Sequence, residues 1–528
     1  MASKQVKQST FDSIVREGIQ DFGLTPQEAV EDACAQLRKA GVTDFANLDI
    51  SVPSDTTSDA HSAKPHINSI REALQSNDSL PLIDALSNLQ STIHDKRDAA
   101  SAVADGLIGL LARCLHHAAN HKHQQIAVIT QLASNLIVTL CATDELNRSA
   151  FVTLTDVDGI ASMKTLFNSL VDTEQHTTFQ LDVETGLPLL QAISSIQRQN
   201  ERVKALFAAG ESLHCLLKWF ISTSDAIANK KIASKEAIKL FGMLCFVVRQ
   251  LLSPDDTTVK VAETFNRARV LAGGNVITQS GLQPIPGGQN LLQILSTFMD
   301  QLRSNSHVNS ARRQLLTECV ATIRACCVSD EICSQVIKLD LHKACLDILQ
   351  EFNTHESSVV AGIALLRNLA ARDECKTPIF ENISIVSNAA QLHVRTSSSI
   401  AEQYCGLLGN LCLRRPDLAR KTTQSGMVDI VLQAMETYSA NKGMQRIACL
   451  ALRNICARDE EARRQLRRKG EAEKLIRKAW KKHTVSCDDV AYAALRELDV
   501  LEDNELRRDE RYTMPTGFYS TPIVREKD

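Results

Sequence analysis

The chain has 528 residues, a formal net charge of −3 at pH 7, 4% aromatic residues and two tryptophans. At roughly 150 residues per domain, this length would correspond to three or four globular domains. The slightly acidic charge balance argues against general binding to nucleic acid, which requires a basic surface. The shortage of large aromatic residues favours close helix packing through small aliphatic side chains.

The sixteen cysteines are typical of a chain kept in a reducing compartment. No CxxC motif occurs, and the pair Cys405 and Cys412 recurs 44 residues later as Cys449 and Cys456. Buried cysteine behaves as a small apolar residue, so we expect core filling, with metal or redox use as the alternative. The polar start is not a signal peptide, and the apolar run at 240–248 is too short to span a bilayer. We expect a soluble cytoplasmic protein, with the nucleus as a second location.

The first predicted domain, residues 1–48, is a small helical hairpin. An apolar stripe at helical spacing marks its first helix, and the stripe consists of Phe11, Ile14, Val15, Ile19 and Phe22. The second helix begins with a capping box of Thr25 and Glu28, has Pro26 at its first position and ends near Gly41. A hairpin of this size exposes an apolar face that must be covered. We expect it to dock on its own chain, with an outside partner as the alternative.

Residues 49–66 are polar, contain two prolines and lack periodicity, so we expect a linker. Helical patterning resumes at about Ile67 and continues to residue 505, and residues 506–528 form a tail. Within 67–505, four tetrads follow Ala-, Leu- and Cys-rich helical runs. They are Leu366 to Leu369, Leu408 to Leu411, Leu452 to Ile455 and Leu495 to Leu498. Their offsets of 42, 44 and 43 residues indicate a stacked helical repeat.

The tetrad pattern extends toward the N-terminus, where further tetrads begin at Ile323, Val248, Ile193 and Ile137. Eight tetrads predict about eight repeats, and helices near 80–93 and 97–118 complete a capping unit. The N-terminal intervals are longer, at 56, 55 and 75 residues. The longest contains a Gly- and Pro-rich segment, 273–289, which we expect to be a loop insertion and not a helix. Insertions in a solenoid often serve binding.

A second marker lies five residues after the third tetrad position. It is acidic or an amide in most repeats, and it is expected to cap the first helix of the next repeat. The marker residues are Asp144, Asn200, Asp255, Asp330, Asp373 and Asp459. The marker fails after Asn410, where Arg415 is followed by Pro416 and Asp417, so we expect capping there one or two residues late.

A period near 42, an L-x-N-L tetrad and a Gly sixteen residues after the Asn, as in Gly426 and Gly470, resemble armadillo repeats. HEAT repeats, the nearest alternative, usually lack both the Asn and this Gly. The segments at 10–12, 15–17 and 26–33 resemble the opening of the armadillo repeat-containing protein 6 family, and Asp255-Asp256 and 265–268 resemble its middle region. The resemblance implies an all-α, armadillo-type right-handed α-solenoid with an N-terminal hairpin, acting as a non-catalytic intracellular scaffold or adaptor.

The tetrads also supply the candidate binding residues. In armadillo proteins the third helix of each repeat lines a concave groove and presents its Asn there, so the resemblance implies carboxamide bonds to the backbone of an extended partner. Arginine recurs one position earlier, which favours an acidic segment. The candidate partner-binding residues are Arg324, Arg367, Asn368, Asn410, Arg453, Asn454 and Arg496.

Because the Asn occurs in three consecutive repeats, we expect a short groove centred on Asn410. The alternative is structural: each Asn bonds its neighbouring repeat, and each Arg pairs with a capping Asp.

The motif searches predict no enzyme and no cofactor. The signatures GxxxxGK[ST], GxGxxG after a strand, HExxH and GxSxG are absent. The spacing of four histidines could place two imidazoles on one metal, but no carboxylate or cysteine falls in register, so we expect a solvated helix end and no metal site. These histidines are His116, His117, His121 and His123.

We therefore predict a scaffold that binds an extended acidic partner segment in its groove. The alternative is a transport or chaperone-like receptor whose N-terminal hairpin blocks the groove until cargo arrives. Importin-α proteins carry a Trp four residues before the Asn, where this chain has Ala364, Gly406 and Leu450, so basic cargo is not expected by that mechanism. The basic run at 463–482 is expected to be a solvated face, with an acidic-partner or nucleic-acid site as the alternative.

Overall fold

The structure is a computed structural model of the chain. It describes residues 8–39 except 21, residues 42 and 50, 63–93, 96–120, 125–153 except 143, 158–170, 183–228, 235–253, 261–304 except 274, 279, 280 and 285–288, and 310–501. The chain forms two compact units. The N-terminal unit consists of Met1–Thr223 and Ser234–Val261, and the C-terminal unit of Ser224–Ala233 and Ala262–Asp528.

The predicted hairpin consists of α1 (Gln8–Gln20) and α2 (Pro26–Lys39). Its capping box forms as predicted, because the Glu28 amide donates to Thr25 Oγ1 over 3.3 Å and the Thr25 amide donates to Glu28 Oε2 over 2.9 Å. Phe11, Val15 and Ile19 pack against α2 residues in a core of the hairpin's own. Phe22 is 69% exposed, so its place in the apolar stripe was wrong. The end expected near Gly41 lies outside the described residues.

The solenoid part of the N-terminal unit begins with two helices, α4 (Lys64–Ser76) and α5 (Ser79–Thr92). The first helix starts three residues before the end of the predicted linker, and residues 51–62 lie outside the described part. Three repeats of three helices follow. They are α6 (Lys96–Ala104), α7 (Leu107–Asn120) and α8 (Ile126–Cys141); α9 (Glu145–Thr153), α10 (Gly159–Ser169) and α11 (Val183–Gln197); and α12 (Glu201–Ala208), α13 (Ser212–Ala228) and α14 (Lys235–Leu251).

The C-terminal unit continues with α15 (Val261–Leu271), α16 (Leu291–Ser304) and α17 (Ser310–Cys326). Four regular repeats then follow. They are α18 (Asp330–Lys338), α19 (Leu341–Glu351) and α20 (Glu356–Leu369); α21 (Asp373–Phe380), α22 (Ile383–His393) and α23 (Ser398–Cys412); α24 (Pro416–Gln424), α25 (Met427–Thr437) and α26 (Lys442–Cys456); and α27 (Glu460–Lys469), α28 (Glu471–Lys482) and α29 (Thr484–Leu498). The armadillo-type organisation into three-helix repeats is therefore confirmed.

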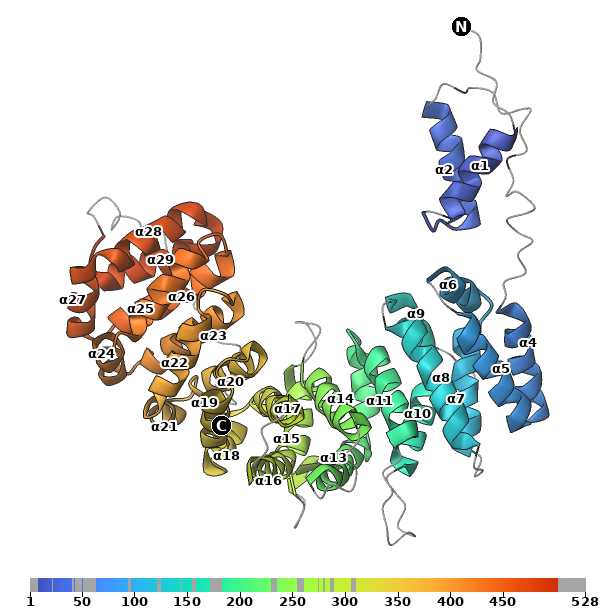
Figure 1. The fold of residues 1–528 in the computed structure, drawn as a ribbon, viewed down its shortest axis with the longest axis horizontal. Coiled ribbons are helices and arrows are strands. Elements are labelled where there is room, and N and C mark those ends of the chain that lie inside the picture. The colour runs from blue at the N-terminus through green and yellow to red at the C-terminus, as the bar shows by residue number, and fades with distance from the viewer. Residues whose placement is uncertain are drawn as a thin grey trace. The chain divides into compact units, whose positions relative to one another are not determined.

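Every tetrad lies in the last turns of the third helix of its repeat. The first and fourth tetrad residues are buried, as in Leu366 and Leu369, because positions three apart share one helix face. These residues pack successive third helices together within each unit, for example α8 on α11 and α20 on α23 (Figure 1). The second and third tetrad positions consequently lie on the other side, which we call the third-helix face.

The 273–289 insertion is not a helix, as predicted, but it is not irregular throughout. The strands β1 (Asn275–Thr278) and β2 (Gly281–Pro284) pair antiparallel, with Thr278 opposite Gly281. Val276 and Ile277 are β-branched residues, which favour strands over helices. This short hairpin is the one departure from helix among the described elements.

The capping marker works in some repeats and fails in others. Asp144, Asn200 and Asp459 accept hydrogen bonds from the amides of the helices that follow them, as predicted. Ser329, and not Asp330, caps α18, while α21 and α24 begin after Arg372 and Arg415 without a side-chain cap. The predictions for Asp330, Asp373 and Asp417 were therefore wrong, since these residues fall inside the first helical turn. Asp255 lies outside the described residues.

The predicted glycines have a clear backbone role. Gly426 and Gly470 join the first and second helices of their repeats with φ of 72° and 64°. This left-handed region carries little steric cost for glycine. Asp340 occupies the corresponding joint between α18 and α19 with φ of 53°, which shows that the turn geometry is kept where the glycine is missing.

In several repeats the fourth residue of the first helix is basic and buried. Lys204 donates to the Ser253 carbonyl over 2.7 Å, and Lys376 donates to the Leu413 carbonyl over 2.6 Å. Arg148 likewise donates to the Cys141 carbonyl over 3.0 Å. These carbonyls lie at or just beyond the C-terminal ends of third helices, where the helix dipole favours a positive charge.

We expect Lys376→Met to destabilise the fold by about 1.5–3 kcal/mol, because it removes hydrogen bonds from a charged donor to a helix-end carbonyl and to Asp373 Oδ1. Chemical denaturation followed by circular dichroism measures this. Lys421→Met, at an exposed position of α24, is the matched control and should change the free energy of unfolding by less than about 0.5 kcal/mol. Equal losses in both variants would contradict the bracing role.

Asp459 predicts a pH dependence. Burial alone raises its pKa, but the hydrogen bonds from Arg420 and from the Ala462 amide outweigh burial and leave the pKa lowered. An aspartate in the unfolded chain titrates near 3.9. Because the folded pKa lies lower, the carboxylate stabilises the fold above about pH 3.9, and this contribution is lost as the pH falls through the folded value. Asp459→Asn keeps a capping side chain, so its stability deficit should be full at pH 7 and shrink toward pH 2 in denaturation curves. A deficit that does not change with pH would contradict this.

Candidate functional site

The seven predicted binding residues lie on the third helices of the C-terminal unit. Arg324 is on α17, Arg367 and Asn368 are on α20, Asn410 is on α23, Arg453 and Asn454 are on α26, and Arg496 is on α29. All hold second or third tetrad positions and so belong to the third-helix face. Neighbouring helices of this row pack directly against one another.

Two of the three asparagines use their side-chain amide groups as hydrogen-bond donors within the solenoid. Asn410 Nδ2 donates to the Arg367 carbonyl, and Asn454 Nδ2 donates to the Gly409 carbonyl, each over 3.0 Å. In both cases the acceptor is the second tetrad position of the preceding repeat. The N-terminal unit repeats the arrangement, since Gln250 Nε2 donates to the Ser194 carbonyl over 3.3 Å. We call this set of bonds the amide ladder.

Small residues allow the ladder to form. A Cβ atom on Gly409 would lie 3.2 Å from the Ala451 Cα, so α23 and α26 approach closely at this level. The close approach brings the Asn454 side chain within reach of the Gly409 backbone. For Asn410 and Asn454, the geometry agrees with the structural alternative stated for the sequence: these carboxamides hold neighbouring repeats together.

Asn368 differs from the other two. It is half-buried on α20, and its side chain makes no hydrogen bond to the residues that the structure describes. The equivalent residue in the preceding repeat is Ala325. No hydrogen bond joins the Asn368 side chain to α17 in the part of the chain that the structure describes. Its carboxamide retains both a donor and an acceptor for a ligand.

The two arginines beside Asn368 form a close cationic pair. Arg324 is exposed, and Arg367 is half-buried with its guanidinium against Gly406, where a Cβ atom would lie 2.3 Å from Arg367 Nε. Burial lowers the pKa of Arg367 and the positive charge of Arg324 lowers it further, while the negative charge of Glu402 partly offsets both effects. Arg367 Nη1 donates to Gln403 Oε1 over 3.2 Å, and no carboxylate within the described residues forms an ion pair with Arg324 or Arg367.

The two remaining predicted arginines are Arg453 on α26 and Arg496 on α29. Arg496 pairs with the adjacent Glu497 over 3.1 Å, and Arg453 is half-buried on α26. Within the described structure, Arg324, Arg367 and Arg496 form no ion pair with a capping aspartate. That arrangement instead involves Arg372, which pairs with Asp330, and Arg420, which pairs with Asp459 over 2.8 Å.

One further residue on a third helix was not predicted from the sequence. Phe246 on α14 lies four residues before Gln250, is 43% exposed and has the Arg249 guanidinium 5.9 Å from its ring centroid. This distance is typical of a cation–π contact. The signal in the sequence was an aromatic residue four positions before the third tetrad residue. That position was considered only in the repeats that carry Asn, where it is Ala364, Gly406 and Leu450.

The basic run at 463–482 is partly neutralised. Five of its members form ion pairs, with partners on α25, α27 and α28 and with Asp499. These members are Arg463, Arg464, Arg467, Lys469 and Arg477. Lys474, Lys478, Lys481 and Lys482 form an exposed stripe on α28. The mixture of paired and solvated charges agrees with the prediction of a solvated face.

Groups suited to metal or thiol chemistry were also located. All sixteen cysteines are free and buried, as the core-filling prediction requires, and burial raises the pKa of Cys114, Cys345 and Cys405 to about 12. Among the described residues no three His, Cys, Asp or Glu side chains gather to hold a metal. His116 shares a 2.8 Å hydrogen bond with Asn120, while His121 and His123 lie outside the described residues.

No single helix in the described ranges is long and apolar enough to cross a membrane, and one bent pair, Asp98–Ala104 with Leu107–Asn120, meets the length and composition test.

The stacked three-helix repeats, with a tetrad closing each third helix, define an all-α armadillo-type solenoid. Proteins of this class are typically non-catalytic interaction scaffolds. Residues 3–66 match the family described as "Armadillo repeat-containing protein 6 N-terminal domain".

The chain is also similar to full-length relatives. It is 26% identical over 441 residues to Armadillo repeat-containing protein 6 of Homo sapiens, covering 80% of this chain and 76% of that protein. The Drosophila melanogaster homolog is 24% identical, with 70% and 78% coverage. The resemblance to the armadillo repeat-containing protein 6 family is thereby confirmed.

Solved structures with a likeness to the chain are also armadillo proteins. A designed armadillo repeat protein is 18% identical and covers 48% of this chain and 98% of its own, with a TM-score of 0.34. A chain from a structure of the cadherin and β-catenin interaction is 16% identical, with 75% and 69% coverage and a TM-score of 0.36.

The amide ladder predicts a stability effect. The double variant Asn410→Ala/Asn454→Ala should lose about 1 kcal/mol per site, because each change removes a hydrogen bond between neighbouring helices. The urea midpoint of the far-ultraviolet circular dichroism signal reports the loss. Asn368→Ala is the matched control and should stay within about 0.5 kcal/mol of the wild type. A harmless double change, or an equal cost at Asn368, would contradict the ladder.

Proposed function

We propose that the protein is a non-catalytic interaction scaffold that binds an extended acidic segment of a partner protein along the third-helix face of its C-terminal unit. The binding centre is the trio of Arg324, Arg367 and Asn368 on α17 and α20. This centre lies one repeat closer to the N-terminus than the Asn410 centre expected from the sequence, because the Asn410 donor is already used in the ladder.

The observation that carries the proposal is the Arg324 and Arg367 pair. Two like charges raise each other's electrostatic energy, and the lowered pKa of Arg367 reflects both its burial and this repulsion. A carboxylate placed between them would relieve the repulsion and gain charge-assisted hydrogen bonds. A basic segment would add a third positive charge and be rejected.

Asn368 supplies what the arginines lack. Guanidinium groups only donate hydrogen bonds, whereas a carboxamide donates and accepts, so it can bind the N–H and C=O of one extended residue. The arginines would then select acidic side chains, and Asn368 would fix the position of the partner backbone. The Arg367 guanidinium is already held by Gln403 and by its contact with Gly406, which reduces the entropy lost on binding.

The repeat spacing sets the length of the partner segment. Third helices about 10 Å apart correspond to about three residues of extended chain. The row from α17 to α29 therefore accommodates a segment of about twelve residues, with Arg453 and Arg496 beyond the centre as further positive groups. We also propose a cytoplasmic location, supported by sixteen free thiols.

Fluorescence anisotropy with a labelled peptide of about twelve alternating Glu and Ser residues tests the proposal. The double variant Arg324→Gln/Arg367→Gln should bind about tenfold more weakly, because it removes both charge-assisted contacts while keeping helix propensity. Asn368→Ala should weaken binding by a smaller factor of about three to tenfold, without a loss of stability.

The matched control is Lys474→Gln/Lys478→Gln, which removes the same charge from an exposed face of α28. It should bind like the wild type at 150 mM salt, where distant surface charges are screened. The proposal fails if the control loses as much affinity as the arginine variant, or if a Lys and Ser peptide binds as tightly as the acidic one.

A further inference from the structure

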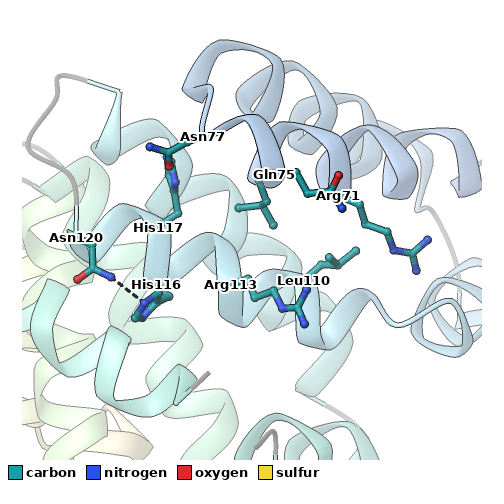
Figure 2. A pocket seen from close by; sticks show the side chains of 9 residues that line it. Arg71, Gln75, Asn77, Leu110, Arg113, His116, His117 and Asn120 are labelled. Atoms are coloured by element: carbon teal, nitrogen blue, oxygen red, sulfur yellow. Dashed lines mark hydrogen bonds between the residues drawn. The ribbon is translucent and has the colours of Figure 1, made fainter. Parts of the chain in front are cut away.

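A cleft of about 460 Å³ opens between α4 and α7 in the N-terminal unit. It lies between the second helices of neighbouring repeats and is separate from the third-helix face. Figure 2 shows the side chains that line it. They are Arg71, Leu74, Gln75 and Asn77 from the α4 side, and Leu110, Arg113, His116, His117 and Asn120 from α7.

The lining of this α4–α7 cleft has one sign of charge. Arg71 and Arg113 are permanently cationic, and no Asp or Glu lines the cleft. Gln75, Asn77 and Asn120 add neutral hydrogen-bonding groups. Low-dielectric walls that carry a single sign of charge concentrate counter-ions of the opposite sign.

Several of these groups are held in place by neutral partners. Arg71 Nη1 donates to Asn68 Oδ1 over 2.8 Å, and its Nη2 donates to the Asp105 carbonyl. His117 Nε2 lies 3.3 Å from Ser79 Oγ, and His116 Nε2 lies 2.8 Å from Asn120 Nδ2. Each of these contacts fixes a side chain without adding a negative charge to the cleft.

Helix electrostatics explain only part of the arrangement. His117 lies in the last turn of α7, a place where the helix dipole favours basic residues. Arg71 and Arg113 lie near the middle of their helices, where the dipole effect has faded. Both arginines nevertheless place a permanent positive charge at the same cleft.

We propose that the α4–α7 cleft is a second binding site, which holds the anionic side chains of an acidic protein segment. In the view of Figure 2, Arg71 and Arg113 lie toward one end, and Asn77, His116, His117 and Asn120 toward the other. Two guanidinium groups at one end suit a ligand with more than one negative charge, and the amide and imidazole groups at the other end offer neutral hydrogen bonds. Leu74 and Leu110 provide apolar contact for the aliphatic parts of such a segment.

The volume agrees with this ligand class. Clefts of about 300–1,000 Å³ bind small ligands or a few side chains, so a cleft of 460 Å³ accommodates part of a peptide and not a folded surface. Carboxylate and phosphate groups share the required chemistry, since both accept charge-assisted hydrogen bonds from guanidinium groups. The two sources are separated by experiment.

The test uses the full chain and two labelled four-residue probes, one of glutamates and one of phosphoserines, with inorganic phosphate as a competitor. Arg71→Gln/Arg113→Gln should weaken probe binding about tenfold or more, since each lost charged hydrogen bond costs close to a factor of ten. Preference for the phosphoserine probe assigns a phosphorylated segment, and equal binding assigns an acidic one. Either outcome supports the site.

Because Arg71 also contacts Asn68 and Asp105, a second variant keeps the test independent of folding. Gln75→Glu removes no contact found in the structure, retains helix propensity and places a negative charge in the cleft, so it should weaken binding about tenfold. Arg202→Gln/Lys478→Gln removes two exposed charges elsewhere and should leave binding unchanged.

Three outcomes overturn the proposal: neither probe binds, Gln75→Glu binds like the wild type, or a tetralysine probe binds as well as the anionic ones. The Arg324→Gln/Arg367→Gln variant separates this site from the proposed function. Loss of probe binding in that variant alone would support the third-helix face and refute the α4–α7 cleft. If the Arg324→Gln/Arg367→Gln variant still binds the probe and the cleft variants do not, the cleft is the binding site. This result would hold even if the third-helix face binds no partner.

Discussion

The stacking of third helices is the interaction on which the rest of the structure depends. Each tetrad buries its first and fourth residues against the neighbouring repeat, and the third position often reaches back to the carbonyl of the preceding second position. Apolar burial supplies most of the stability, and the amide ladder fixes the relative height of neighbouring helices. Small residues such as Gly409 and Ala451 make this possible, because the amide reaches its acceptor only when the helices approach closely.

This dependence decides which polar residues are available for binding. Tetrad position alone makes Asn368, Asn410 and Asn454 equivalent, yet two of them hold the solenoid together and one does not. A side chain that already satisfies its donor gains little by exchanging one hydrogen bond for another. The Arg324 and Arg367 pair differs, since burial and the charge of Arg324 leave the pKa of Arg367 lowered even though the charge of Glu402 acts against both. The proposed binding centre therefore lies where two positive charges meet and a carboxamide keeps its donor.

The sequence predicted the repeat length, the three helices per repeat, the capping box of the hairpin and the burial of the cysteines, because each depends on local pattern. It did not predict that Ser329, and not Asp330, caps α18. A marker defined by its spacing from the tetrad cannot locate the start of a helix to within one residue. It also missed β1 and β2, whose pairing depends on contacts across a turn. The partners of Asn410 and Asn454 depend on interhelix distance, which no single repeat encodes.

The distribution of positive charge follows the same logic. Arg148, Lys204 and Lys376 are buried in first helices and donate to carbonyls at the ends of third helices, where helix dipoles favour them. Lys204 and Lys376 also pair with Glu201 and Asp373. In the α18 repeat Cys333 takes the equivalent position, and Cys327 Sγ donates to the Ile323 carbonyl over 3.2 Å. The α18 repeat therefore has no basic residue at this position, and the buried cation of its neighbourhood is Arg312 on α17, which donates to the Leu302 carbonyl over 2.8 Å. Positive charge placed on helix-end carbonyls is structural, whereas the neighbouring charges of Arg324 and Arg367 are the ones to which the proposed function assigns an anionic partner.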